Sequence, residues 1–120
     1  GSEMCIRDRL DDDVETVVAC VLRRHNLEFL HLAHDEYPPM SWTSLVYVLL
    51  TVDGAYVGET DRFKERLIAH RRGKPHFDTY FVARLADKSR ARATESSVIR
   101  DLAHEGLPML STYDAVHGVC

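Results

Sequence analysis

Long hydrophobic runs, a cysteine framework and glycine- or proline-rich tracts are all missing from this chain of 120 residues. No run approaches the roughly 18 apolar residues that a membrane-spanning helix needs, so we expect no membrane partner. The three cysteines, Cys5, Cys20 and Cys120, show no CxxC spacing. An odd number without a framework favours reduced thiols in a cytoplasmic protein over a disulfide scaffold.

Lysine and arginine are absent from two stretches of the chain, residues 41–60 and 101–120. Residues 1–40 carry a net charge of −5 and residues 61–100 a net charge of +6, within an overall formal charge of −4. The overall charge disfavours nucleic acid as a partner, but a local basic stretch can form a face that binds polyanions. A solvated helix surface is the alternative explanation of the same charges.

The length is sufficient for one domain with one core. Gly1-Ser2 looks like an expression scar and "EMCIRDR" resembles translated adapter sequence, so we expect residues 1–9 to be a scar and a gene-model artefact. Residues 10–43 are expected to be an N-terminal helix and a connector, and residues 44–118 the main domain.

A first helix is predicted over residues 10–26, because Asp11 to Asp13 favour a helix N-terminus and valines recur on one face. These valines follow the spacing i, i+3, i+4, i+7: Val14, Val17, Val18 and Val21. The connector that follows is broken by Pro38 and Pro39, and it begins either as a short strand or as a helical turn.

Three strands are predicted, over residues 43–52, 55–58 and 79–85, because β-branched and aromatic residues are concentrated there. The first is apolar throughout, which is typical of a strand buried on both faces. Asp53-Gly54 indicates a hairpin turn between the first two strands.

Two more helices are predicted, each with residues that start and stop it. The first packs through Phe63 and Leu67, and its cap and stop residues are Thr60 or Asp61, Gly73 and Pro75. The second spans residues 87–106, and its cap and stop residues are Ser89, Gly106 and Pro108. Residues 109–116 are a tail or a short edge strand. The order α-β-β-α-β-α predicts an α+β fold, with a small antiparallel or mixed three-stranded sheet flanked by helices.

Two strand tyrosines share a sheet face if the hairpin turn holds two or four residues: Tyr47 and Tyr56. On the next helix, the spacing i, i+3, i+4, i+7 predicts that Arg66 and His70 lean inward with Phe63 and Leu67. An inward arginine needs a partner, and its guanidinium suits a phosphate or a carboxylate. The alternatives are packing tyrosines, a structural salt bridge and a core histidine.

A carboxylate stands on the apolar face of the last predicted helix, where Glu95 precedes Val98, Ile99 and Leu102 at helical spacing. It should be paired, protonated or bound to a cation. One carboxylate with waters and a substrate phosphate is a common way to hold Mg²⁺. The alternative is a structural ion pair with Arg66.

Taken in order, these residues resemble the GIY-YIG nuclease superfamily over roughly residues 44–118. The resemblance is carried by "LVY" at 45–47, "YVG" at 56–58, Arg66, His70 and Glu95. It implies a GIY-YIG-like fold with an extra N-terminal helix, and a metal-dependent endonuclease that hydrolyses phosphodiester bonds in DNA.

The resemblance also implies a role for each residue. Glu95 would hold one Mg²⁺ or Mn²⁺ ion, and Arg66 would clamp the phosphate. Tyr47, relayed by His70, would position or deprotonate the attacking water, with Tyr56 beside it. Basic side chains on the outer face of the helix are suited to neighbouring phosphates: Lys64, Arg71, Arg72 and Lys74.

Two departures from the family pattern leave other functions open. Leu45 stands where the family name has glycine, and the segment "LPMLSTYDAVHG" lacks the family's late asparagine. Ser111 or Thr112 could replace its hydrogen bond. A catalytically silent nucleic-acid-binding module on the same fold is one alternative. A protein-interaction domain, whose acidic N-terminal helix docks a partner or a second copy, is another. A homodimer and a larger multidomain protein are both compatible with the sequence.

Overall fold

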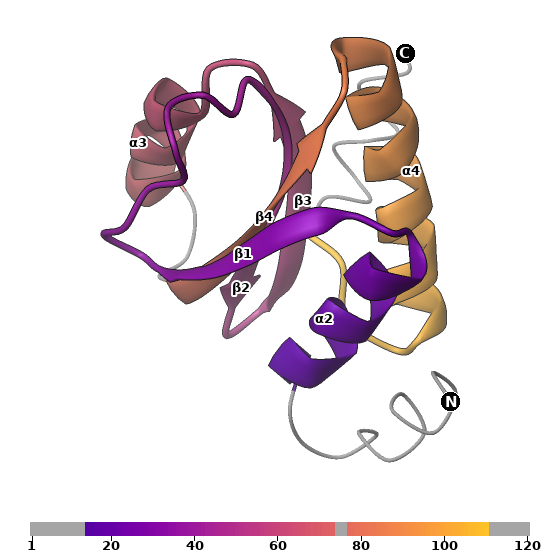
Figure 1. Ribbon diagram of the computed structural model, residues 1–120. Coiled ribbons are helices and arrows are strands. Elements are labelled where there is room, and N and C mark those ends of the chain that lie inside the picture. The colour runs from indigo at the N-terminus through magenta and orange to yellow at the C-terminus, as the bar shows by residue number, and fades with distance from the viewer. Residues whose placement is uncertain (1–13, 74–76, 111–120) are drawn as a thin grey trace, which may run out of the picture.

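The computed structural model describes residues 14–73 and 77–110 of the chain. Helices flank a single sheet in an α+β arrangement (Figure 1). In chain order, the described elements are α2 (Val14–Arg24), β1 (Glu28–Ala33), β2 (Ser44–Thr51), β3 (Gly54–Thr60), α3 (Phe63–Gly73), β4 (Phe77–Leu85) and α4 (Lys88–His104).

The sheet has four antiparallel strands in the order β1-β4-β2-β3, so the prediction of three strands is wrong. The added strand is β1, which pairs with β4 from Glu28 opposite Arg84 to Ala33 opposite Thr79. It is an outer strand whose side chains are exposed or half-buried, so its apolar pattern is weak. Its pairing also means that a division of the chain at residue 43 crosses one sheet.

The central strand β2 is buried on both faces, as predicted, because β3 and β4 flank it and helices cover both sides. The hairpin turn is Val52-Asp53, one residue earlier than predicted, since Thr51 pairs with Gly54. Gly54 opens β3 at a φ of +144°, and a Cβ there would lie 2.5 Å from the carbonyl oxygen of Pro108. The glycine is therefore needed inside the strand rather than in the turn.

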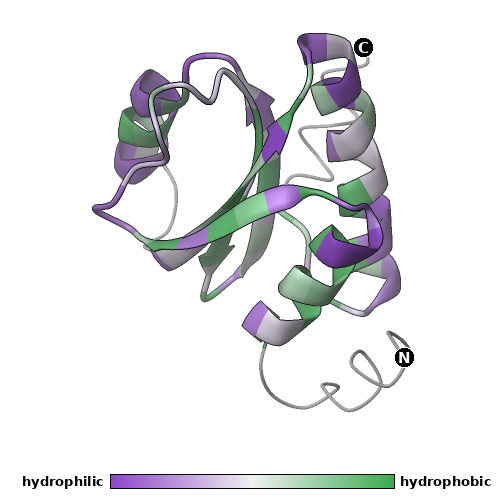
Figure 2. Ribbon diagram, in the orientation of Figure 1, coloured by the Kyte–Doolittle hydropathy of each residue, from purple (hydrophilic) through white to green (hydrophobic). Residues whose placement is uncertain are grey.

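The two faces of the sheet are covered by different helices (Figure 1). Helices α2 and α4 pack on one face, and α3 lies on the other. The strands are largely hydrophobic, whereas the α3 ribbon is mostly hydrophilic with hydrophobic residues between (Figure 2). The α4-side cluster consists of Val18, Val21, Leu22, Val46, Val48, Ala55, Val57, Phe81, Ala91, Val98, Ile99 and Leu102. The α3-side cluster consists of Leu45, Tyr47, Leu49, Phe63, Leu67, Phe77, Tyr80 and Val82.

The helix ends show which local signals act. Asp87, not the predicted Ser89, caps α4, because its carboxylate accepts the backbone N–H of Arg90 at 2.8 Å. Gly106 ends that helix at a φ of +94°, as its position predicts. Ahead of α3, the Thr60 hydroxyl accepts the backbone N–H of Arg62 at 2.9 Å.

Several predictions concern the chain ends. Met109 forms a parallel bridge with Ala55, which agrees with a short edge strand. Asp11 to Asp13, Pro75 and residues 111–118 lie outside the described residues.

Val14 is 45% exposed, so the predicted apolar face of α2 begins at Val17. Cys20 is buried and disulfide-bonded, so the expectation of a reduced thiol is wrong there. Within the described ranges, no helix is long and apolar enough to cross a membrane.

Candidate functional site

A buried hydrogen bond joins the middle of β2 to the last turns of α3. The Tyr47 hydroxyl oxygen lies 2.7 Å from Nε2 of His70, and the two side chains are 1% and 6% exposed. Gly58 lies opposite Tyr47 on β3. A Cβ at Gly58 would stand 2.6 Å from Cζ of Tyr47, so the ring reaches His70 only because this position is glycine.

Tyr56 lies on the same sheet face as Tyr47, as the even-length turn predicts. Its ring centroid is 4.7 Å from that of His70 and 6.4 Å from that of Tyr47. Tyr56 is half-buried, whereas Tyr47 is enclosed. The family resemblance assigns the attacking water to Tyr47, but the structure leaves Tyr56 as the tyrosine of the pair with accessible surface.

Arg66 lies on the margin of the buried stripe of α3. Phe63, Leu67 and His70 are buried, while Arg66 is exposed, so its predicted inward orientation is wrong. An exposed guanidinium needs no buried partner and stays available for a ligand. It borders a hollow of about 280 Å³ at the start of α3. Its charge still acts on Tyr47: burial raises the pKa of Tyr47 above its ordinary value, and Arg66 opposes that rise.

Glu95 lies half-buried on α4. Burial raises the pKa of its carboxyl above the ordinary value, and the neighbouring carboxylate of Glu59 raises it further. Arg66 acts in the opposite direction. Among the described residues no salt bridge joins Glu95 to Arg66, so a structural ion pair does not account for this carboxylate.

Glu59 is a member of the site that the sequence analysis does not identify. Lys88 Nζ lies 3.2 Å from its Oε2 atom, and Arg92 Nε lies 3.7 Å from its Oε1 atom. Oε2 is buried and makes no aligned hydrogen bond despite the nearby ammonium group. A signal was present, because strand alternation places Glu59 on the α4 side, where a carboxylate must find a partner.

The carboxylates of Glu59 and Glu95 fit a divalent cation. Burial makes the ionised form of Glu95 costly, so positive charge would stabilise it, and one oxygen of Glu59 lacks a hydrogen bond. No cluster of three or more His, Cys, Asp or Glu side chains suited to a metal ion occurs in residues 14–73 and 77–110. Mg²⁺ does not need such a cluster when waters and a substrate phosphate complete its ligands.

The basic side chains of α3 divide into two groups. Arg72 is exposed, as predicted. Lys64 and Arg71 contact the connector instead, because both lie over the ring of Tyr37, at 5.8 Å and 5.6 Å from its centroid. Arg71 also donates a hydrogen bond to the Tyr37 hydroxyl at 3.1 Å. Lys74 lies outside the described residues.

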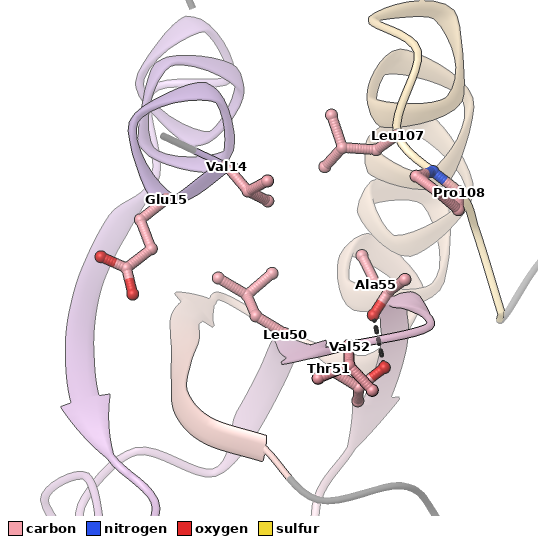
Figure 3. Close-up of a pocket in the computed structure, with 9 residues that line it drawn as sticks. Val14, Glu15, Leu50, Thr51, Val52, Ala55, Leu107 and Pro108 are labelled. Carbon is pink, nitrogen blue, oxygen red and sulfur yellow. Dashed lines mark hydrogen bonds between the residues drawn. The ribbon is translucent and has the colours of Figure 1, made fainter. Parts of the chain in front are cut away.

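A separate hollow of about 380 Å³ lies beside the β2–β3 hairpin, between the start of α2 and the segment after α4 (Figure 3). Leu50, Ala55 and Leu107 contribute to its mainly apolar wall. None of the predicted site residues lines it, and Glu15 is its one charged lining side chain among the described residues. This hollow therefore lacks the paired acid, base and cation that the Tyr47–His70 region offers.

No family model, curated protein sequence or solved structure matches this chain. The functional interpretation therefore rests on the residues and on their arrangement.

Proposed function

We propose that this protein is a metal-dependent endonuclease of GIY-YIG type that hydrolyses phosphodiester bonds in DNA. The observation that carries the proposal is the buried hydrogen bond between Tyr47 and His70, with the Tyr56 ring against the same imidazole. A tyrosine hydroxyl and an imidazole enclosed together are costly unless they are paired, and their pairing leaves a defined base beside an accessible tyrosine.

The phosphate contact is assigned to Arg66. Its guanidinium is exposed at the edge of the hollow at the start of α3, where two N–H groups can bind two phosphate oxygens. Glu95, with Glu59 beside it, would hold the divalent cation. When bound, that cation supplies positive charge for the leaving oxygen.

The proton of the attacking water is assigned to the aromatic cluster. His70 is assigned as the base: in the tautomer whose Nε2–H donates to the Tyr47 hydroxyl oxygen, Nδ1 is the atom that takes the proton. Burial keeps Tyr47 a neutral phenol, so its hydroxyl orients the imidazole rather than acting as a phenolate. Tyr56, which has accessible surface, is the tyrosine that contacts the water.

The direct test is a cleavage assay with single- and double-stranded DNA and RNA, in Mg²⁺ or Mn²⁺ and in EDTA. Wild type should cut DNA only with the metal, and Glu95→Gln and Arg66→Ala should each lose at least about 100-fold in rate. Glu28→Gln is the matched control, because Glu28 is exposed on β1 and should leave the rate unchanged. A Glu95→Gln variant that cuts as fast as wild type would overturn the assignment.

A second candidate is a catalytically silent nucleic-acid-binding module. The enclosure of Tyr47 and the pairing of Glu59 with Lys88 favour it, since both describe a closed site. Salt-sensitive DNA binding without cleavage under any divalent metal would support this candidate over the enzyme.

A further inference from the structure

A hollow of about 350 Å³ beside the first turn of α3 has no part in the proposed chemistry. The connector between β1 and β2 forms one wall, and α3 forms the other. The apolar and aromatic side chains that line it are Tyr37, Pro38, Pro39, Met40, Trp42, Leu45 and Phe63. Tyr37 is 41% exposed and Met40 is 96% exposed. Exposed aromatic and thioether groups around a concave surface mark a binding site more often than a packing defect.

The connector wall is held in place before any ligand arrives. The backbone N–H of Trp42 donates to the carbonyl oxygen of Pro39 at 3.0 Å and closes a turn. Tyr37 is fixed from the other side by Arg71, whose guanidinium donates to its hydroxyl and lies over its ring. Two prolines within the wall restrict the backbone further. A ligand therefore meets a formed hollow and need not order the connector.

The charges at the rim select the part of a ligand that enters. Asp61 and Glu65 line this hollow and also the hollow that Arg66 borders, so the two adjoin. Carboxylates repel a phosphate inside the hollow, but they accept hydrogen bonds from exocyclic amino groups of bases. Lys64 at the rim and Arg66 beyond the carboxylates are placed for phosphates outside.

We propose that this hollow binds an unpaired nucleobase of the strand whose phosphates contact α3. Flat aromatic faces bind bases of any sequence by stacking, and a base can enter only when it is not stacked inside a duplex. The proposal rests on the proposed function in taking DNA as the ligand. It adds that the preferred substrate carries a single-stranded or extruded nucleotide next to the phosphate at Arg66.

Trp42 lines this hollow and is the single tryptophan of the chain, so its fluorescence can be assigned to this position. A short single-stranded DNA should quench it in EDTA at low salt, and the same strand in a duplex should quench it much less. Binding of the labelled strand, followed by anisotropy, should show the same affinity as the quenching. Binding by anisotropy without any change in Trp42 fluorescence would overturn the proposal, as would equal quenching by single strand and duplex.

Two variants separate stacking from folding. Trp42→Ala should weaken single-strand binding by about 10-fold and change duplex binding far less. Because Trp42 is half-buried, Met40→Asp provides a second test at a nearly fully exposed position that the fold does not need. Val52→Asp is its matched control, since Val52 is 93% exposed on the hairpin outside this hollow. Met40→Asp should weaken single-strand binding several-fold more than Val52→Asp, and equal effects would contradict the proposal.

The binding assay and the cleavage assay test the base site and the nuclease separately. Quenching of Trp42 by single-stranded DNA in EDTA, together with no cleavage in Mg²⁺ or Mn²⁺, would overturn the nuclease and support the base site. Cleavage with no response of Trp42 would overturn the base site and support the nuclease.

Discussion

The two faces of the sheet bury side chains of different kinds. The α4-side cluster is aliphatic apart from Phe81, and two helices cover it. The α3-side cluster contains two fully buried tyrosines, Tyr47 and Tyr80, under one largely hydrophilic helix. Aliphatic packing requires side chains of matching volume and shape, whereas a buried hydroxyl also requires a hydrogen-bond partner at a fixed position.

This difference indicates a division of labour. The α4 side stabilises the fold, and Glu59 and Glu95 lie half-buried at its margin. The α3 side holds polar atoms in fixed positions, through Tyr47 on His70 and through the Tyr80 hydroxyl on the carbonyl oxygen of Glu36. Substitutions in the aliphatic core of the α4 side should therefore lower stability alone, whereas substitutions of the buried polar groups on the α3 side should also lower activity.

The largest loss of stability is expected on the α4 side. Leu102 of α4 is fully buried in the cluster that α4 forms with the sheet and α2. Leu102→Ala should lower the free energy of unfolding by about 2–5 kcal/mol. Leu67→Ala, at an equally buried position of α3, should cost less because a single peripheral helix can settle into the space. Urea denaturation of both variants measures the difference. A larger loss for Leu67→Ala would contradict the division.

A smaller loss is expected at Gly58, where the α3 side depends on a missing side chain. Gly58→Ala places a methyl group against the ring of Tyr47 and should cost about 1–3 kcal/mol. The cost should fall when Tyr47 is replaced by leucine, which a double-mutant cycle measures. Gly106→Ala is the control: its cost comes from a φ of +94° with open space around it, so it should not depend on Tyr47.

The two buried tyrosines provide a matched pair of still smaller changes. Tyr47→Phe and Tyr80→Phe each remove one buried hydroxyl and its hydrogen bond, and each should cost about 1–2 kcal/mol. Only Tyr47→Phe should slow DNA cleavage, because only Tyr47 contacts His70. Thermal unfolding and cleavage rates on the same preparations test this. Equal cleavage by both variants would remove Tyr47 from the site.

The sequence predicts the elements that have strong local signals. The spacing of valines, the apolar run at β2 and the glycine after α4 each agree with the structure, because local periodicity and turn chemistry suffice there. The sequence offers a short strand at the start of the connector as one of two alternatives, and β1 confirms that alternative, but the sequence does not predict that this strand joins the sheet. Its half-exposed residues gain their structure from pairing with β4, which lies about fifty residues further along the chain.

The site could be predicted only in part. Strand parity places Tyr47 and Tyr56 on one face of the sheet, and helix spacing places His70 on the buried stripe of α3. The contacts of Tyr47 with Tyr56 and with His70 therefore follow from periodicity. Periodicity does not determine depth at the edge of a helix stripe, which is why Arg66 is exposed and Tyr47 enclosed. The proximity of Glu59 to Glu95 depends on how α4 lies against the end of β3, and only tertiary structure determines that.

The smallest expected effect on stability concerns Glu95. Its folded-state pKa is raised, so the fold binds a proton more tightly there than the unfolded chain does. That contribution is fully present below the ordinary glutamate value of 4.5 and is lost as the pH rises through the folded value. Glu95→Gln removes the penalty of the ionised form. The variant should therefore melt slightly above wild type at neutral pH and show no advantage below about pH 4.

Added Mg²⁺ or Mn²⁺ distinguishes a metal ligand from a carboxylate that is merely poorly solvated. A cation that binds the folded state raises the melting temperature with its concentration, so wild type at neutral pH should gain stability from the metal. Glu95→Gln should gain much less, and Glu28→Gln should behave as wild type because its carboxylate lies exposed on the far edge strand. The two halves of the measurement are independent. A higher melting temperature for the variant without metal establishes the unfavourable charge, and a metal response confined to chains that retain Glu95 establishes the ligand. Equal metal responses in wild type and Glu95→Gln would mean that the raised pKa of Glu95 reflects only its burial and the neighbouring carboxylate of Glu59, and would remove Glu95 as the metal ligand.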